Sequence, residues 1–122
     1  VKKVYVWCTT EFESWHYWPD AKWKYGYLSN SHRHMFHVRV EVEVTDTDRQ
    51  IEFIDLKHRV NGLCDAFVVS SNSPMSFSCE MIAESILEAL LLTIHKRAIV
   101  VTVSEDGENG ATVEHYYHPE VI

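Results

Sequence analysis

The chain has 122 residues, with 11 Lys and Arg against 18 Asp and Glu and a formal net charge of −7. Its 46% hydrophobic and 24% charged residues are typical of one globular domain, which we expect to span residues 1–122. The acidic balance argues against a nucleic-acid partner, and no apolar run approaches the ~18 residues of a membrane span. No signal-peptide pattern opens the sequence, so we expect a cytoplasmic protein. The unusual count is eight histidines.

The cysteines do not form a recognisable framework. Cys8, Cys64 and Cys79 are odd in number, widely spaced and without a C-x-x-C pair. Disulfide scaffolds and cysteine-rich zinc sites need paired cysteines at short or regular spacings. We therefore expect three reduced thiols, most of them in the core.

The first half of the chain predicts two strands joined by a loop. Residues 3–16 and residues 32–45 alternate apolar with polar side chains, and in the second segment valines alternate with charged residues. Residues 17–31 contain Pro19, Gly26 and several aromatic residues and predict a loop. The second strand ends at a Thr and Asp run that is typical of a turn.

The second half predicts two helices followed by a β-hairpin. Ser78 is a candidate N-cap of the longer helix, and the basic residues at 95–97 suit its C-terminal end. The order ββααββ indicates an α+β fold with two helices on one face of an antiparallel four-stranded sheet. The expected elements are a helix at 54–63, a loop at 65–78, a helix from 79 onward, a strand at 98–105, a turn at 106–110 and a strand at 111–117.

Three of the eight histidines share one predicted face of the sheet. His32 and His34 are two residues apart on one strand, and His16 has the parity of the apolar face of the other. If the strands pair antiparallel, the three imidazoles converge at one end of the sheet. Three neutral imidazoles with an open fourth position are what a catalytic Zn²⁺ site needs. The alternative is that each is a half-buried polar residue bonded to backbone; the other five histidines are expected to be solvated.

Five short patterns occur in an order that resembles one known family. They are Phe12 with His16, His32-Arg33-His34, Glu52-Phe53 before Leu56-Lys57, Ser78 with Glu80 and Ala83, and Glu105 at the end of the third strand. On these residues nearly the whole chain resembles the 6-pyruvoyl-tetrahydropterin synthase and 6-carboxytetrahydropterin synthase family. The resemblance implies the tunnelling fold, in which ββααββ units assemble into multimeric β-barrels with active sites between subunits.

The resemblance also implies a chemistry and roles for particular residues. It assigns Zn²⁺ to His16, His32 and His34, and recognition of the pterin ring to Glu105. It implies a homo-oligomer, a trimer, tetramer or hexamer, that binds a small-molecule pterin. The expected activity is that of a zinc-dependent lyase of the 6-carboxytetrahydropterin synthase type. Its substrate would be 7,8-dihydroneopterin triphosphate, in the pathway to queuosine and other 7-deazaguanines.

The chain departs from this family where the general base is expected. Leu28 stands where the family has its catalytic Cys, and the Asp-His pair that supports that base is missing from the stretch around Cys64 and Asp65. The base is therefore unassigned, with Cys64, Asp65 and Tyr27 as weak candidates, and Cys64 equally suits a buried core position. The alternative function is a catalytically diverged or inactive pterin- or purine-binding oligomer that keeps the three-histidine metal site.

The loop at 17–31 has further binding potential. Its aromatic side chains could stack on a heterocycle or pack at a subunit interface, because Trp and Tyr are enriched at such interfaces. Lys22, Lys24 and Arg33 could meet a triphosphate or could be solvated. Arg33 is predicted on the face opposite the metal ligands.

Overall fold

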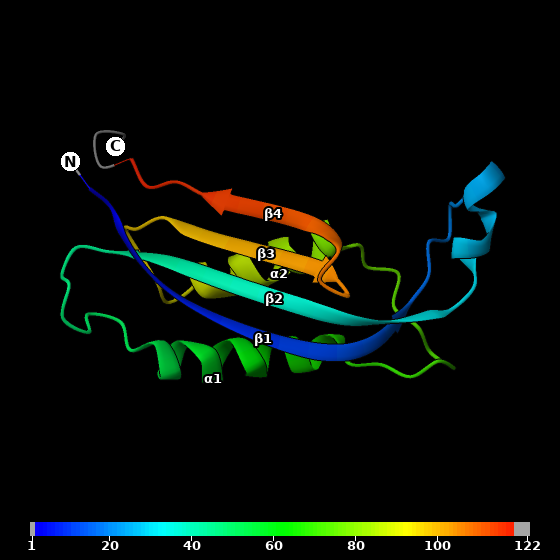
Figure 1. Ribbon diagram of the computed structural model, residues 1–122, viewed down its shortest axis with the longest axis horizontal. Helices are drawn as coiled ribbons and strands as arrows, with labels where there is room; N and C mark the ends of the chain where they lie inside the picture. Colours follow the sequence, from blue (N-terminus) through cyan, green and yellow to red (C-terminus); the bar gives the residue numbers. More distant parts are fainter. Residues whose placement is uncertain (1, 119–122) are drawn as a thin grey trace.

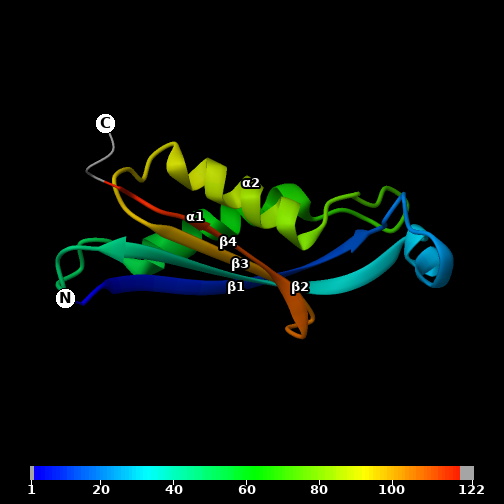
Figure 2. The ribbon, with the colours of Figure 1, turned by 90° about the horizontal axis from the view of Figure 1, so that it is seen from above.

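The computed structural model describes residues 2–118 as a single antiparallel sheet covered on one face by two helices (Figures 1 and 2). The strands lie in the order β1-β2-β3-β4, so that sequence neighbours are also neighbours in the sheet. The predicted α+β fold with a four-stranded antiparallel sheet is confirmed. The elements are β1 (Val4–His16), β2 (His32–Val44), α1 (Phe53–Cys64), α2 (Cys79–Leu91), β3 (Ile99–Glu105) and β4 (Asn109–His115).

The core lies between the sheet and the two helices. The alternation of β2 turns its valines inward, and Val40 and Val42 are fully buried. On α2 the apolar side chains recur at helical spacing, and Ile82, Ile86 and Leu90 are buried against the sheet. Burying such a side chain contributes about 1.5–3 kcal/mol to the free energy of folding. This apolar layer therefore holds the two helices against one face of the sheet.

Both helices begin at side-chain caps. Glu52 accepts a hydrogen bond from the backbone N–H of Ile54, and Ser78 accepts one from the backbone N–H of Met81, as the sequence predicts for Ser78. The C-terminal end of α2 differs from the prediction, because the helix stops at Leu91 and residues 95–97 lie beyond it. Lys96 has a left-handed backbone with a φ of 60°, which turns the chain into β3 and takes these basic residues away from the helix end.

Three local structures also differ from the expected ones. The loop at 17–31 contains a 3-10 turn, η1 (Trp23–Ser29), and a second one, η2 (Asp65–Phe67), directly follows α1. β4 begins at Asn109, two residues earlier than expected, because the hairpin turn is tight: Asp106 and Gly107 have φ values of 57° and 73°. No helix among residues 2–118 has the length and apolar character needed to cross a membrane.

The β1-β2 ribbon extends beyond the other two strands. β1 pairs with β2 along all of both strands, whereas β3 pairs with β2 only over residues 36–42. Residues 13–16 and 32–35 therefore project past the end of β3, toward η1 at the tip of the molecule (Figure 1). β1 and β4 form the two edges of the sheet within this chain.

Candidate metal centre and its cavity

Strand register brings three histidines together at the projecting end of the ribbon. His16 pairs directly with His32 across the β1-β2 ladder, and His34 lies two residues farther along β2 on the same face. Their ring centroids are separated by 4.5 Å for His16 and His32, 5.2 Å for His16 and His34, and 5.1 Å for His32 and His34. One ring nitrogen from each lies within 4.8 Å of the other two. The sequence parity predicts this convergence.

The end of β1 is held by the segment that precedes α2. Met75 donates its backbone N–H to the carbonyl of Trp15 and accepts the backbone N–H of Tyr17, both at 3.0 Å, so His16 is bracketed from both sides. The fully buried Ser14 donates to the carbonyl of Phe67 at 2.5 Å and accepts the backbone N–H of Val69 at 3.2 Å. These bonds make the histidine end of the ribbon a rigid support.

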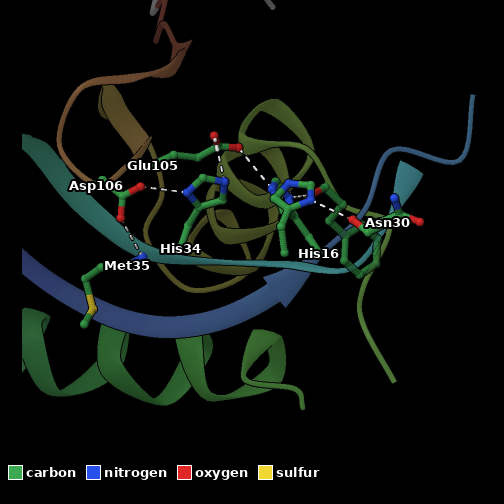
Figure 3. A network of polar contacts seen from close by, with 8 residues as sticks. His16, Asn30, His34, Met35, Glu105 and Asp106 are labelled. Carbon is green, nitrogen blue, oxygen red and sulfur yellow. Dashed lines mark hydrogen bonds and ion pairs between the residues drawn. The ribbon is translucent and has the colours of Figure 1, made fainter. Parts of the chain in front are cut away.

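Each imidazole has its Nδ1 next to an oxygen that can only accept a hydrogen bond. Nδ1 of His16 lies 3.2 Å from the carbonyl oxygen of Phe77, and Nδ1 of His32 lies 2.8 Å from that of Asn30. Nδ1 of His34 lies 2.7 Å from a carboxylate oxygen of Asp106 (Figure 3). In the neutral form of each ring Nδ1 therefore carries the proton, which leaves Nε2 with a free lone pair.

Two of these Nε2 atoms, those of His16 and His34, face a carboxylate. Oε1 of Glu105 lies 3.3 Å from Nε2 of His16, and Oε2 lies 3.4 Å from Nε2 of His34 (Figure 3). Nε2 of His16 is buried and has no hydrogen-bond partner among the described residues. Burial lowers the pKa of His16, which keeps its imidazole neutral. Lone pairs and a carboxylate around one centre fit a bound cation, and neutral imidazoles fit Zn²⁺ in particular.

A cavity of about 570 Å³ opens beside these histidines. Its wall is mostly apolar and aromatic, which suits a small heterocyclic ligand. Two carboxylates, Glu80 and Glu105, belong to the wall. The lining residues come from the end of β1 and the loop after it, η1, β2, the segment before α2 and its first turn, and the β3-β4 hairpin: His16, Tyr17, Trp18, Leu28, His32, Ser76, Phe77, Ser78, Cys79, Glu80, Met81, Glu105, Asn109 and Gly110.

The weak candidates for a general base do not line this cavity. Cys64 is buried at the end of α1, where burial raises the pKa of its thiol to about 12, so it is not a thiolate at neutral pH. Asp65 begins η2, and Tyr27 lies on η1 with 68% of its surface exposed. Leu28, in contrast, belongs to the cavity wall. The structure therefore brings Glu105 and the three histidines together but leaves Cys64, Asp65 and Tyr27 outside.

The sequence reasoning missed two residues at the site. Cys79 is buried in the core, as expected, but as the first residue of α2 it also lines the cavity, which the sequence reasoning did not foresee. Burial, followed by the charges of Glu105 and Glu80, raises the pKa of its thiol to about 12. Asp106 was expected only as part of a hairpin turn, but it holds His34. The sequence feature that could have located Cys79 is the N-cap at Ser78. The residue after an N-cap is the first residue of the helix, and here that helix start lies beside the cavity.

The aromatic loop contributes only part of its side chains to the cavity. Tyr17 and Trp18 line it, whereas Trp23 on η1 is 95% exposed. The cationic residues that could meet a triphosphate or be solvated, Lys22, Lys24 and Arg33, do not line the cavity. Lys24 lies over the ring of Tyr25, and Arg33 pairs with Glu13 at 3.1 Å.

Comparison with known proteins gives a structural match only. No family model and no curated protein matches the chain. A solved structure of 6-pyruvoyl tetrahydropterin synthase (PTPS) from Plasmodium falciparum matches with a TM-score of 0.67 and 20% sequence identity, covering 93% of this chain and 98% of that one. The chain thus has the fold of that synthase over nearly its whole length.

Proposed function

We propose that this protein is a metal-dependent lyase that acts on the side chain of a dihydropterin. The observation that carries the proposal is the set of three imidazoles whose Nε2 lone pairs converge beside a ring-sized cavity. The fold shared with a 6-pyruvoyl tetrahydropterin synthase supports the substrate class. Following the sequence resemblance, we take 7,8-dihydroneopterin triphosphate as the substrate and a reaction of the 6-carboxytetrahydropterin synthase type, toward queuosine and other 7-deazaguanines.

In this proposal the chain's residues bind the metal and orient the ring. His16, His32 and His34 hold Zn²⁺, which, when bound, supplies Lewis-acid stabilisation of enolate character in the substrate side chain. Tyr17 and Trp18 offer aromatic faces to the heterocycle. A carboxylate of the cavity wall, Glu105 by resemblance, accepts hydrogen bonds from the amino and N–H edge of the ring and fixes its orientation.

The general base stays unassigned in this proposal. Leu28 lines the cavity and cannot accept a proton, and by the sequence resemblance it stands where the family has its catalytic Cys. Asp65 and Tyr27 would take part only if a neighbouring subunit presented them to the cavity, and Cys64 is buried in the core of its own chain. Within one chain, the proton-accepting groups of the wall are the carboxylates of Glu80 and Glu105 and the thiol of Cys79.

We further propose that the protein works as a homo-oligomer with sites between subunits, a trimer, tetramer or hexamer. The edges at β1 and β4 support this, because an exposed sheet edge readily pairs with another strand. The exposed Trp23 on η1, the element that also contributes Leu28 to the cavity wall, is the kind of side chain that subunit interfaces bury. A barrel of such subunits would cover both features.

Leu28 favours a second candidate function. A pterin- or purine-binding oligomer that retains the metal site but does not turn over its ligand would need the same three histidines and the same cavity. It would not need an acid-base group where Leu28 stands. The two candidates differ in turnover and agree in metal and ligand binding.

Two measurements on the purified protein test these proposals. Metal analysis should find about one Zn²⁺ per chain, and His32→Ala should lower that content strongly because it removes one of three ligands. If the protein still contains no metal at neutral pH after zinc has been added and the excess removed, both candidate functions are ruled out. Incubation of zinc-loaded protein with 7,8-dihydroneopterin triphosphate should release triphosphate. Stoichiometric zinc with bound but unchanged substrate would leave the binding oligomer.

A further inference from the structure

We propose that Glu105 is a fourth protein ligand of the metal, which closes the site until a substrate oxygen displaces the carboxylate. The proposal rests on the metal site of the proposed function. It goes beyond that function because it gives Glu105 a task other than ring recognition. The two tasks compete, since a carboxylate oxygen that ligates the metal cannot also accept a ring proton.

Strand register places Glu105 on the wall of the metal site. Glu105 is the last residue of β3 and pairs with Phe36, two residues from His34 on the same face of β2. The backbone on either side is held as well. The carbonyl of Glu105 accepts the backbone N–H of Glu108 at 3.0 Å, and the backbone N–H of Asp106 donates to the carbonyl of Met35 at 2.7 Å. Glu105 therefore projects from a rigid part of the sheet.

Two contact distances, from Glu105 to His16 and to His34, match those of neighbouring ligands around one ion. Metal–ligand bonds of ~2.0–2.2 Å in a tetrahedral zinc site set adjacent ligand atoms ~3.3–3.5 Å apart. The two oxygens of Glu105 lie 3.3 Å from Nε2 of His16 and 3.4 Å from Nε2 of His34. In neutral rings with Nδ1 protonated, neither pair of atoms has a hydrogen between them. The Nε2 lone pairs and the carboxylate oxygens of Glu105 therefore repel one another. A cation bound between them would attract both.

The same carboxylate is able to leave. The side chain of Glu105 is 31% exposed and lines the cavity, so it has space to turn away from the histidines. Its departure is a ligand exchange: the bond between the carboxylate and the metal breaks as the bond from a substrate oxygen forms, with no change of oxidation state. Glu80, on the wall of the same cavity, is then a second carboxylate available to the ring.

Cobalt binding by the whole chain tests the proposal, since the visible absorption of Co²⁺ reports coordination number and ligand set. Glu105→Gln should weaken Co²⁺ binding by at least about tenfold, measured by competition with a chelator, and should change the visible spectrum. Glu80→Gln is the matched control: it removes the other wall carboxylate and should leave affinity and spectrum as in the wild type. Glu105→Asp, which keeps the carboxylate, should bind Co²⁺ more tightly than Glu105→Gln, and far-UV circular dichroism checks that each variant is folded.

The possible outcomes separate this proposal from the proposed function. Wild-type affinity or a wild-type spectrum in folded Glu105→Gln would overturn the fourth-ligand role, even if pterins bind. Failure of wild-type protein to bind Co²⁺ would overturn the metal site and this role together. If Glu105→Gln behaves as expected but 7,8-dihydroneopterin does not alter the wild-type spectrum, the ligand role stands and the pterin function falls.

Discussion

Asp106 accepts a hydrogen bond from Nδ1 of His34 at 2.7 Å, and its other carboxylate oxygen accepts the backbone N–H of Met35 at 3.0 Å (Figure 3). These two bonds lower the pKa of Asp106, the one from His34 most of all, so the carboxylate is charged at neutral pH. A carboxylate behind a ligating histidine fixes its tautomer and makes its other nitrogen a stronger metal ligand. Asp106 thus positions His34 in the candidate metal centre.

Asp106→Asn should weaken zinc binding by about 10–100-fold, because outer-shell partners of ligating histidines have effects of this size. Asn keeps an oxygen for the N–H of Met35 and tolerates the φ of 57° at this position, so the hairpin should remain folded. Competition with a chromophoric chelator measures the change. Glu108→Gln is the control, since it removes a charge from the same turn; an equal loss of affinity in both variants would mean that only the local charge matters.

Most of what could be predicted about the site followed from the alternation of side chains along β1 and β2. Alternation along two long strands places His16, His32 and His34 on one face, and no tertiary information beyond antiparallel pairing is needed to bring them together. The cap at Ser78 was predictable for the same reason, because it depends on a local side-chain bond to the backbone.

What could not be predicted depends on contacts between distant segments. His34 and Asp106 are 72 residues apart in sequence, and their bond requires the left-handed backbone at Asp106 that ends β3. The carbonyl of Phe77 that fixes the tautomer of His16 belongs to the backbone and has no residue-type signal. Which thiol reaches the cavity likewise depends on how α2 meets the sheet, so Cys64 and Cys79 could not be distinguished by their type.

The cysteine thiols should react slowly in the folded protein. Burial raises the pKa of Cys64 and of Cys79 from 9.0 to about 12, and it raises the pKa of Cys8 as well. Because only the thiolate attacks a disulfide reagent, Cys64 and Cys79 should be labelled at pH 8 about a thousandfold more slowly than in denaturant. The native rate should then rise about tenfold per pH unit toward pH 12.

A colorimetric thiol count in native buffer and in denaturant makes this measurement. All three cysteines should react at once when the chain is unfolded. Rapid labelling of a single native thiol, lost in Cys64→Ser, would instead mark Cys64 as an activated thiolate and return it to the list of possible bases. Loss of that labelling in Cys79→Ser would point to the cavity.

Ser14→Ala should destabilise the protein by about 1–3 kcal/mol, since it leaves a buried donor and a buried acceptor without partners. The Ser14 hydroxyl is fully buried and joins β1 to the carbonyl of Phe67 and the N–H of Val69. Urea denaturation followed by circular dichroism gives the free energy of unfolding. Ser29→Ala is the control, because that exposed hydroxyl bonds only the nearby carbonyl of Gly26, and its loss should change stability by no more than about 0.5 kcal/mol. Equal effects in both variants would contradict a structural role for the Ser14 bonds.

Leu28→Cys should raise turnover of 7,8-dihydroneopterin triphosphate by about 10²-fold or more, the usual contribution of a positioned acid-base group. Leu28 is half-buried and lines the cavity together with His16 and His32, so a thiol there would lie beside the metal site, where a bound cation lowers its pKa. Leu28→Ala enlarges the same part of the cavity without adding an acid-base group and is the matched control. A gain in both variants would show that space at position 28 limits the rate. A gain in neither, with zinc and substrate still bound, would mean that the chain lacks more of the catalytic machinery than one thiol, which is the result expected of a binding oligomer.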